Sequence, residues 1–273
     1  MIRRSSGVVV LAVILLSAVA AEAQIDARLL RQPDVSSTQI AFVYGGDIWL
    51  VEKGGGVAQR LSTPAGEESF PRFSPDGRHL AFTGNYDGNS DIYSVPVTGG
   101  LPTRLTHHPD LDRMLDWYPD GESILYATRM ASEKQSFSKL YRVSARGGLP
   151  EVLPVPYGEF GAISADGSTL AYQPLSREFR TWKRYRGGKT PEIWLFGLDD
   201  LKARNITDND ANDGQPMWHG STLYFLSDRD ANMRANIWAK DLETDEVRQV
   251  TFFEDFDCHF PAIGPDDLVF ENG

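Results

Sequence analysis

The sequence predicts an all-β fold: a β-propeller with four-stranded blades, of which five are complete and a sixth is partial. Two observations predict it: a unit of short strand-like segments that recurs along the chain, and a tight-turn motif within several of these units. A period of roughly 40 to 50 residues with several short strands per unit is typical of propellers. The chain beyond residue 24 has no sustained helical periodicity, which agrees with a fold built from strands.

The clearest copy of the unit runs from Phe70 to Pro109. It contains a Ser-Pro-Asp-Gly turn, an apolar triplet, an Asp-Ile-Tyr strand, a Gly-Gly turn and an Arg-Leu-Thr end. Proline presets φ in such a turn, and glycine accepts the positive φ that the turn requires. The triplets start 40, 44, 46, 53 and 45 residues apart, at Ile40, Leu80, Ile124, Leu170, Leu223 and Leu268. Their mixture of branched, aromatic and small residues suits strands that are packed on both faces between blades.

The later parts of the unit also recur. The strand after the triplet reads DIW, DIY, KLY, EIW and NIW, starting at Asp47, Asp91, Lys139, Glu192 and Asn236. The closing segments read QRLS, TRLT, RNIT and RQVT, starting at Gln59, Thr103, Arg204 and Arg248. Complete units extend from about Ile40 to Phe252, and "CHFPAIGPDDLVFENG" begins a sixth that stops after its second strand. We therefore expect a truncated chain; the alternative is that "RLLRQPDVS" near the N-terminus completes the last blade.

The N-terminus has the pattern of a cleavable signal peptide. Arg3 and Arg4 precede an apolar run from Gly7 to Ala20, and Ala21-Glu22-Ala23 fits the small-x-small cleavage pattern. We predict a signal peptide over residues 1–23, a propeller over residues 24–273, and a periplasmic or secreted bacterial protein. The alternative is a membrane anchor, but the run is shorter than the roughly 20 apolar residues that a span needs.

The charge of the chain argues against nucleic-acid binding, and its cysteine content excludes an intrachain disulfide. The chain has a net charge of -11, and an acidic protein of this kind repels phosphate backbones, so nucleic acid is not an expected partner. Cys258 is the only cysteine, so no intrachain disulfide can form. Adjacent residues of a strand point to opposite faces. We therefore expect Cys258 to be a buried thiol rather than a nucleophile activated by His259.

No catalytic, metal or cofactor motif is recognisable. The chain lacks a G-x-S-x-G elbow, an H-E-x-x-H motif and a Walker loop, and its five histidines occupy different points of different repeats. "DNDANDG" (208–214) lacks the glycine and the glutamate that an EF-hand loop needs, so we interpret it as a polar loop. A sugar-binding or metal-binding propeller enzyme would need a charged channel rim, and the predicted innermost strands show no convergent set of acidic residues, although Asp116 is a candidate.

One segment concentrates positive charge. "REFRTWKRYRGGK", Arg177 to Lys189, holds six cations and falls in the longest interval between triplets, so we predict an exposed hairpin inserted in blade four. Arginine suits carboxylates geometrically, so we expect it to dock an acidic partner, a neighbouring domain or a peptide carboxylate. The docking candidates are Arg177, Arg180, Lys183, Arg184 and Arg186. The alternative is a self-packed, solvated hairpin with arginines stacked on its aromatic residues.

Three segments resemble tricorn-type proteases: "FPRFSPDGRHLAF" (70–82), "FRTWKRYRGGKTPEIWLF" (179–196) and "LYFLSDRDANMRANIWAKDL" (223–242). In that family a six-bladed N-terminal propeller precedes a second propeller, a PDZ domain and a serine-peptidase domain. The resemblance implies a non-catalytic propeller that filters or channels peptides, with the catalytic residues outside this chain. The implied partners are peptides and the downstream domains, with homo-oligomer formation left open, and no cofactor is implied.

A TolB-like periplasmic scaffold that binds proteins and catalyses nothing is the alternative function. TolB shares the weaker "SPDG…LAF…DIY" unit but places a separate α/β domain before its propeller. In the present sequence the repeats begin soon after the predicted cleavage site. This arrangement favours the tricorn-like interpretation.

Overall fold

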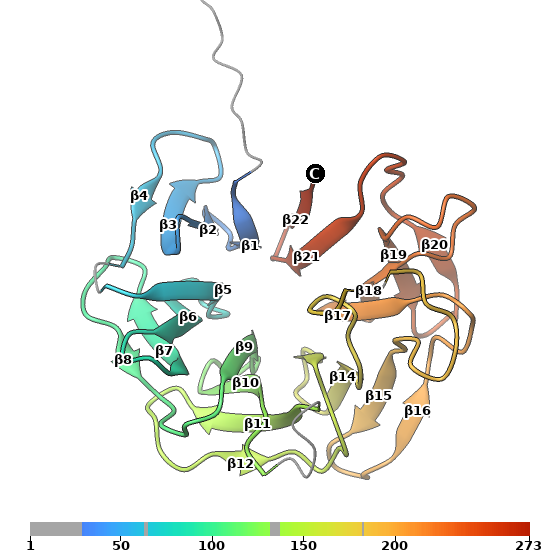
Figure 1. The fold of residues 1–273 in the computed structure, drawn as a ribbon, viewed down its shortest axis with the longest axis horizontal. Helices are drawn as coiled ribbons and strands as arrows, with labels where there is room; N and C mark the ends of the chain where they lie inside the picture. The colour runs from blue at the N-terminus through green and yellow to red at the C-terminus, as the bar shows by residue number, and fades with distance from the viewer. Residues whose placement is uncertain (1–28, 63–64, 132–136, 182) are drawn as a thin grey trace, which may run out of the picture.

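The computed structural model describes residues 29–273 except 63–64, 132–136 and 182 (Figure 1). Its strands form five four-stranded sheets and one two-stranded sheet, which are arranged as blades around a central axis (Figure 1). The predicted all-β propeller with five complete blades and a partial sixth is thereby confirmed. The predicted signal peptide, residues 1–23, lies outside the described residues. Within the described ranges, no helix is long and apolar enough to cross a membrane.

Each complete blade contains four consecutive strands in chain order. Blades one and two comprise β1 (Arg31–Val35), β2 (Gln39–Tyr44), β3 (Asp47–Glu52), β4 (Gln59–Arg60), β5 (Glu67–Phe73), β6 (His79–Asn85), β7 (Ser90–Pro96) and β8 (Thr103–Arg104). Blades three and four comprise β9 (Asp112–Trp117), β10 (Ser123–Thr128), β11 (Lys139–Ser144), β12 (Glu151–Val152), β13 (Phe160–Ile163), β14 (Thr169–Gln173), β15 (Trp194–Gly197) and β16 (Ala203–Asn205). Blade five comprises β17 (Asp213–His219), β18 (Thr222–Ser227), β19 (Asn236–Asp241) and β20 (Val247–Gln249), and the partial blade comprises β21 (Cys258–Ile263) and β22 (Leu268–Asn272).

The ring begins with β1, which pairs with β2 in blade one, with Val35 opposite Ile40. The alternative in which this N-terminal segment completes the last blade is therefore wrong. The partial blade instead packs directly against β1. A Cβ added at Gly264 would lie 2.5 Å from the Val35 carbonyl oxygen, so this close approach requires glycine. The backbone amide of Gln32 also donates to the Glu271 carboxylate at 2.6 Å.

The hydrophobic core lies between adjacent blades, as the triplets predict. In "LAF" of blade two, Leu80 and Phe82 belong to a cluster shared with blade one, whereas Ala81 belongs to a cluster shared with blade three. All three residues are fully buried. Alternate side chains of one strand thus cover opposite faces of the sheet, and both faces are packed.

The threonine that ends the closing segments also has a structural role. In three blades its hydroxyl accepts a hydrogen bond of 2.8–2.9 Å from an isoleucine amide within the third strand or directly before it: Thr106 from Ile92, Thr207 from Ile193 and Thr251 from Ile237. This bond satisfies a backbone donor beside the point where the fourth strand ends. The recurrence of R-x-T-like endings in the sequence therefore has a structural explanation.

Candidate functional site

The innermost strands of all six sheets enclose a central cavity of about 560 Å³. Pro75, Asp76 and Ala165 line this cavity and are exposed. These residues lie in the turns between the first and second strands of their blades, so the cavity reaches solvent on the turn side of the ring. We call this opening the turn-side mouth.

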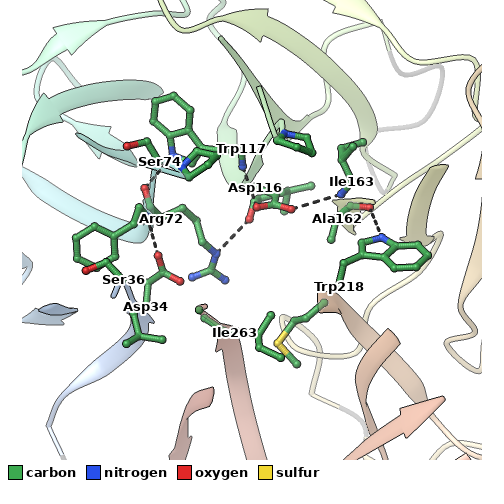
Figure 2. A pocket seen from close by; sticks show the side chains of 18 of the residues that line it. Asp34, Ser36, Arg72, Ser74, Asp116, Trp117, Ala162, Ile163, Trp218 and Ile263 are labelled. Atoms are coloured by element: carbon green, nitrogen blue, oxygen red, sulfur yellow. Dashed lines mark hydrogen bonds between the residues drawn. The ribbon is translucent and has the colours of Figure 1, made fainter. Parts of the chain in front are cut away.

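Two aspartates on different blades reach the cavity wall (Figure 2). Asp34 on β1 accepts a hydrogen bond of 2.6 Å at Oδ2 from the Phe73 amide of blade two. Asp116 on β9 accepts one of 2.8 Å from the Trp117 amide and one of 3.4 Å from the Ile163 amide of blade four. Each carboxylate therefore joins its own blade to the next blade and still borders the cavity.

Arg72 lies between these carboxylates in Figure 2. Its Nε donates to the Leu115 carbonyl at 3.1 Å, and its Nη1 donates to the Pro71 carbonyl at 3.0 Å. Those two bonds fix the guanidinium beside the cavity. One cation therefore accompanies two anionic groups in a confined space.

Burial controls the protonation of both carboxyls. It raises the pKa of Asp34 to about 6, against the opposing effects of the Arg72 charge and of hydrogen bonds from the Phe73 and Val35 amides. It raises the pKa of Asp116 to about 7, again against the charge of Arg72. Removing water disfavours the charged form of a carboxyl. The single arginine therefore compensates incompletely for the desolvation of the two aspartates.

Four innermost strands contain the same local distortion. A residue with positive φ precedes a proline in each of them: Gln32 at 49°, Phe70 at 53°, Gln215 at 51° and Phe260 at 44°. The strand register shifts at each of these positions, which marks a β-bulge. Positive φ is uncommon for residues other than glycine and concentrates at functional positions. Two of the four residues are phenylalanines that meet at the end of the cavity away from the turn-side mouth.

At that end Phe70 and Phe160 line the cavity, and they pack with Phe179 and Phe260, outside the lining, in an aromatic layer of four rings. The Phe179 ring centroid lies 6.2 Å from that of Phe70, 6.1 Å from that of Phe160 and 6.4 Å from that of Phe260. Phe179 comes from the basic segment of blade four, whereas the other three belong to the innermost strands of blades two, four and six. Four rings from separate parts of the chain therefore converge at this end.

Arg113 of β9 supports the aromatic layer. Its guanidinium carbon lies 4.6 Å from the Phe179 ring centroid and 4.8 Å from that of Phe160. Glu159 neutralises it, with a carboxylate oxygen 3.3 Å from Nη2. Burial holds the pKa of Arg113 below its usual value, although the Glu159 charge opposes that effect. A paired cation held between aromatic faces fixes their arrangement.

The basic segment, Arg177 to Lys189, does not form the predicted hairpin. Its described residues contain turns and no paired strands. In its first part Arg177, Glu178 and Arg180 are half-buried while Phe179 and Thr181 are exposed, and Lys183 to Lys189 is exposed throughout. The predicted exposure therefore holds in full only for the later part. The segment is therefore folded back over one end of the ring. The reason is that its charges have partners in other blades.

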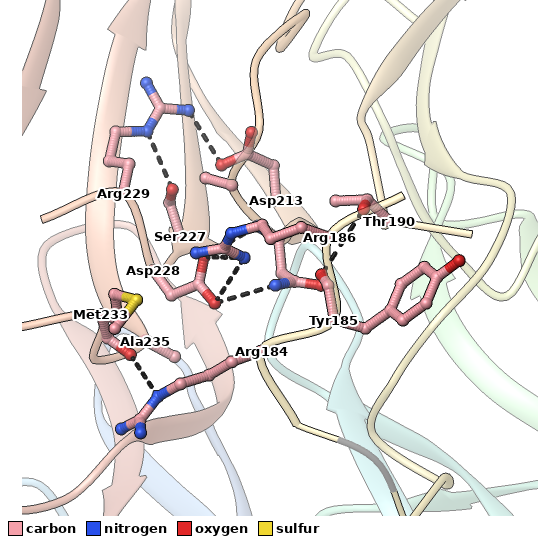
Figure 3. Close-up of polar contacts among 12 residues, drawn as sticks. Arg184, Tyr185, Arg186, Thr190, Asp213, Ser227, Asp228, Arg229, Met233 and Ala235 are labelled. Atoms are coloured by element: carbon pink, nitrogen blue, oxygen red, sulfur yellow. Dashed lines mark hydrogen bonds and ion pairs between the residues drawn. The ribbon is translucent and has the colours of Figure 1, made fainter. Parts of the chain in front are cut away.

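Asp228 of blade five is the main anchor of the basic segment (Figure 3). This carboxylate is fully buried and pairs with Arg177 at 3.3 Å and with Arg186 at 3.1 Å. The backbone amide and side-chain amide of Asn212 also donate to it, at 2.8 and 2.9 Å. Burial alone would raise the pKa of Asp228, but the hydrogen bonds from Arg186 and Asn212 and the Arg177 charge hold it below its usual value. Two of the predicted docking cations are thus already paired within the chain.

The remaining candidates differ in their availability. Arg180 donates to the Ser176 carbonyl at 2.8 Å, and Arg184 donates to the Met233 carbonyl of blade five at 3.2 Å (Figure 3). Lys183 is exposed and forms no ion pair with the described residues. The structure thus gathers the predicted residues on one side of the ring but engages most of them in its own fold.

A third ion pair connects the basic segment to the partial blade. Glu178 lies 2.9 Å from Nδ1 of His259. The hydrogen bond with Glu178 raises the pKa of His259, although burial opposes this shift. Cys258 is buried as expected, and burial raises its pKa to about 11. This thiol and His259 therefore do not form a nucleophile–base pair.

Comparison with known proteins shows which proteins share this architecture. The tricorn protease N-terminal beta propeller domain matches residues 27–273. Tricorn protease homolog 1 of Streptomyces coelicolor is 34% identical over 205 residues, covering 74% of this chain and 19% of the homologue. The crystal structure of the tricorn protease superposes with a TM-score of 0.78 at 24% identity, over 90% of this chain and 24% of that chain. TolB from Acinetobacter baumannii superposes with a TM-score of 0.67 at 20% identity, over 85% of this chain and 56% of that chain.

The two structural likenesses show the fold alone. The chain spans about a fifth of the length of the Streptomyces homologue. The domain match covers nearly the whole chain, including the aromatic layer and the basic segment. This chain therefore belongs to the family of tricorn protease N-terminal β-propeller domains.

Proposed function

We propose that this chain is the non-catalytic N-terminal propeller of an exported tricorn-like serine peptidase, and that its central cavity filters peptides moving to or from a peptidase domain. The observation that carries the proposal is the aromatic layer across one end of a cavity that is open at the other. A passage that narrows at a ring of side chains selects by width, because a folded or bulky chain cannot enter it.

The side chain best placed to act as the filter is Phe179. It is the only member of the aromatic layer that comes from a connecting segment rather than an innermost strand. Its side chain is 52% exposed, whereas Phe70 and Phe160 are buried. Connecting segments move more readily than the sheets that support them. Displacement of this one segment would therefore widen the passage without disturbing a blade.

We also propose that the basic segment docks a partner, but through fewer residues than the sequence predicted. Lys183 and Lys189 are exposed, so they would meet an acidic surface of a neighbouring domain or partner. Arg177 and Arg186 hold the segment in place through Asp228 and would act indirectly. Export is proposed from the N-terminal sequence alone, and sequencing the N-terminus of protein recovered from the periplasm or medium tests cleavage after Ala23.

Turnover of peptides of graded length by the full-length protein tests the filter. Phe179→Ala removes the ring from the passage, so we expect kcat/KM to rise several-fold for long peptides and to change little for the shortest. Phe252→Ala is the matched control, because Phe252 is 73% exposed and lies in the connection between β20 and β21. Equal effects of Phe179→Ala at every length would contradict filtering by this layer. Absence of peptidase activity in the full-length protein would favour the TolB-like scaffold.

A further inference from the structure

We propose that the central cavity is a binding site for the amino-terminal end of a peptide, with Asp34 and Asp116 receiving the ammonium group. The inference deepens the proposed function and rests on it for the source of the ligand. The binding site itself is defined by the cavity lining, so it can be tested without any measurement of turnover.

The charge of the lining selects for a cation. Among the described residues that line the cavity, the ionisable ones are Asp34, Asp76 and Asp116 with one arginine, Arg72. The innermost strands β13, β17 and β21 contribute no ionisable residue to this lining. In a space of low dielectric, the aspartates on facing walls repel the carboxylate of a ligand and attract a ligand group with one positive charge. A peptide that enters amino end first brings that charge without a negative partner nearby.

Gln215 supplies an independent indication of a ligand. It lines the cavity and is 6% exposed, yet its Nε2 has no hydrogen-bond partner among the described residues. A buried amide donor without a partner is costly, and a ligand carbonyl would satisfy it once the Gln215 side chain turns its amide toward the cavity. An ammonium group with a carbonyl close by is the arrangement at the amino end of every peptide. Neither a simple metal ion nor an alkylamine offers both groups.

The walls suit a peptide rather than a bare ion. Trp117 and Trp218 line the cavity, and their indole nitrogens donate to the Arg72 and Ala162 carbonyls at 2.9 and 3.2 Å. These bonds fix both rings as parts of the wall (Figure 2). Fixed aromatic surface accommodates aliphatic side chains and also attracts cations.

The protonation of the cavity predicts a bell-shaped affinity. The Asp34 and Asp116 carboxyls, with pKa values of about 6 and about 7, lose their charge as the pH falls toward 5. An α-amino group loses its charge above roughly pH 8. Affinity for an amino-terminal ligand should therefore peak near pH 7. Binding near pH 6.5 should release protons from the carboxyls, which calorimetry detects as a dependence on the buffer's ionisation enthalpy.

Calorimetry with leucinamide as the probe tests the proposal on the full-length protein. Leucinamide carries an ammonium beside a carbonyl, and N-acetyl-leucinamide is the matched probe that lacks the charge. At pH 7 we expect leucinamide to bind at least about tenfold more tightly than N-acetyl-leucinamide. Asp116→Asn and Asp34→Asn should each weaken leucinamide binding about tenfold or more. Asp120→Asn removes the same charge from a turn on the same face but does not line the cavity, so it should bind normally.

Arg72→Gln provides a second test that leaves both aspartates in place. The Arg72 charge lowers the pKa of both carboxyls, so its removal should move the acidic limb of the affinity profile for leucinamide to higher pH, and this prediction can be tested even if an aspartate variant fails to fold. Equal binding of the acetylated probe, or leucinamide binding that none of the three cavity variants changes, would overturn the proposal. Either result would leave the filter intact, because the turnover of peptides by the Phe179→Ala protein is a separate measurement.

Discussion

Arg177 of blade four and Asp228 of blade five are 51 residues apart in sequence and form an ion pair of 3.3 Å that fastens the basic segment across the ring. The Arg177 side chain is 11% exposed and the Asp228 side chain is fully buried. A positively charged insertion in an acidic protein is thus partly explained by an internal acceptor. The positive charge of the basic segment therefore contributes to the fold independently of any role in docking.

Asp228→Ala should therefore be strongly destabilising. It removes the acceptor of Arg177, Arg186 and Asn212 and leaves a buried arginine without a counter-ion, which costs about 3–5 kcal/mol. Urea denaturation measures the change in the free energy of unfolding. Asp120→Ala is the control, because its pair with Arg142 is half-exposed and should cost about 1 kcal/mol or less. Similar losses in the two variants would contradict the anchoring role of Asp228.

The cavity aspartates should make the protein less stable as pH rises. Their pKa values are raised from 3.8 to about 6 and about 7, so the folded protein holds protons that the unfolded chain has released. The contribution of these two carboxyls to the free energy of unfolding is greatest below pH 4. It is lost as the pH rises through 6 and 7, and the loss is on the order of 3 kcal/mol per group. Asp116→Asn should remove its share of this pH dependence. If the free energy of unfolding of this variant changes between pH 4 and pH 8 as steeply as that of the wild-type protein, the Asp116 carboxyl is not responsible for the pH dependence.

The ion pair between Glu178 and His259 should contribute stability at low pH only. The carboxylate raises the pKa of His259, so the pair is fully formed below the ordinary histidine pKa of about 6.5 and weakens as pH rises through the folded value. Glu271 and Asp257 also face this imidazole and act in the same direction. His259→Gln should lower the melting temperature more at pH 5.5 than at pH 9. A difference in melting temperature that does not vary with pH would mean that the pair does not titrate.

The threonines of the closing segments should be interchangeable with serine but not with valine. Thr207→Val keeps the shape and leaves the Ile193 amide without its acceptor, which costs about 1–3 kcal/mol for a buried donor. Thr207→Ser keeps the hydroxyl and should cost less. Chemical denaturation of the two variants measures the difference. Equal stabilities would assign the recurrence of threonine to strand propensity rather than to this hydrogen bond.

The fold was predictable because its signals are local and repeat. The turn of Ser74 to Gly77, the triplet from Leu80 and the strand from Asp91 each depend on neighbours within one blade. The start of the ring was less predictable, because the triplets mark the second strand of each blade and β1 precedes the first of them. The x-Pro step in Phe70-Pro71 and Phe260-Pro261 recurs in Gln32-Pro33, and this signal could have assigned β1 to blade one.

The site was only partly predictable from the sequence. Asp116 was identified as an acidic candidate, but Asp34 and Arg72 gain their importance from strands that the ring brings together. The same reason explains the incorrect hairpin at residues 177–189. Nothing near Arg177 in the sequence indicates that Asp228 will lie beside it. The alternation of cations and aromatic residues suggested stacking within the segment, whereas Phe179 packs on rings from three blades.

Blocking the turn-side mouth tests most directly whether the cavity carries peptides. Ala165 lines the mouth and is exposed, whereas Ala203 is exposed on the outermost strand β16 and does not line the cavity. Cys258 is the one cysteine of this chain and is buried, so within the propeller a cysteine introduced at either alanine should react selectively with a bulky maleimide, and labelled protein without the introduced cysteine is the control for the rest of the protein. Labelled Ala165→Cys full-length protein should lose at least about nine-tenths of its turnover of long peptides, while labelled Ala203→Cys protein should retain it. Full turnover by the labelled Ala165→Cys protein would show that peptides do not pass through this ring.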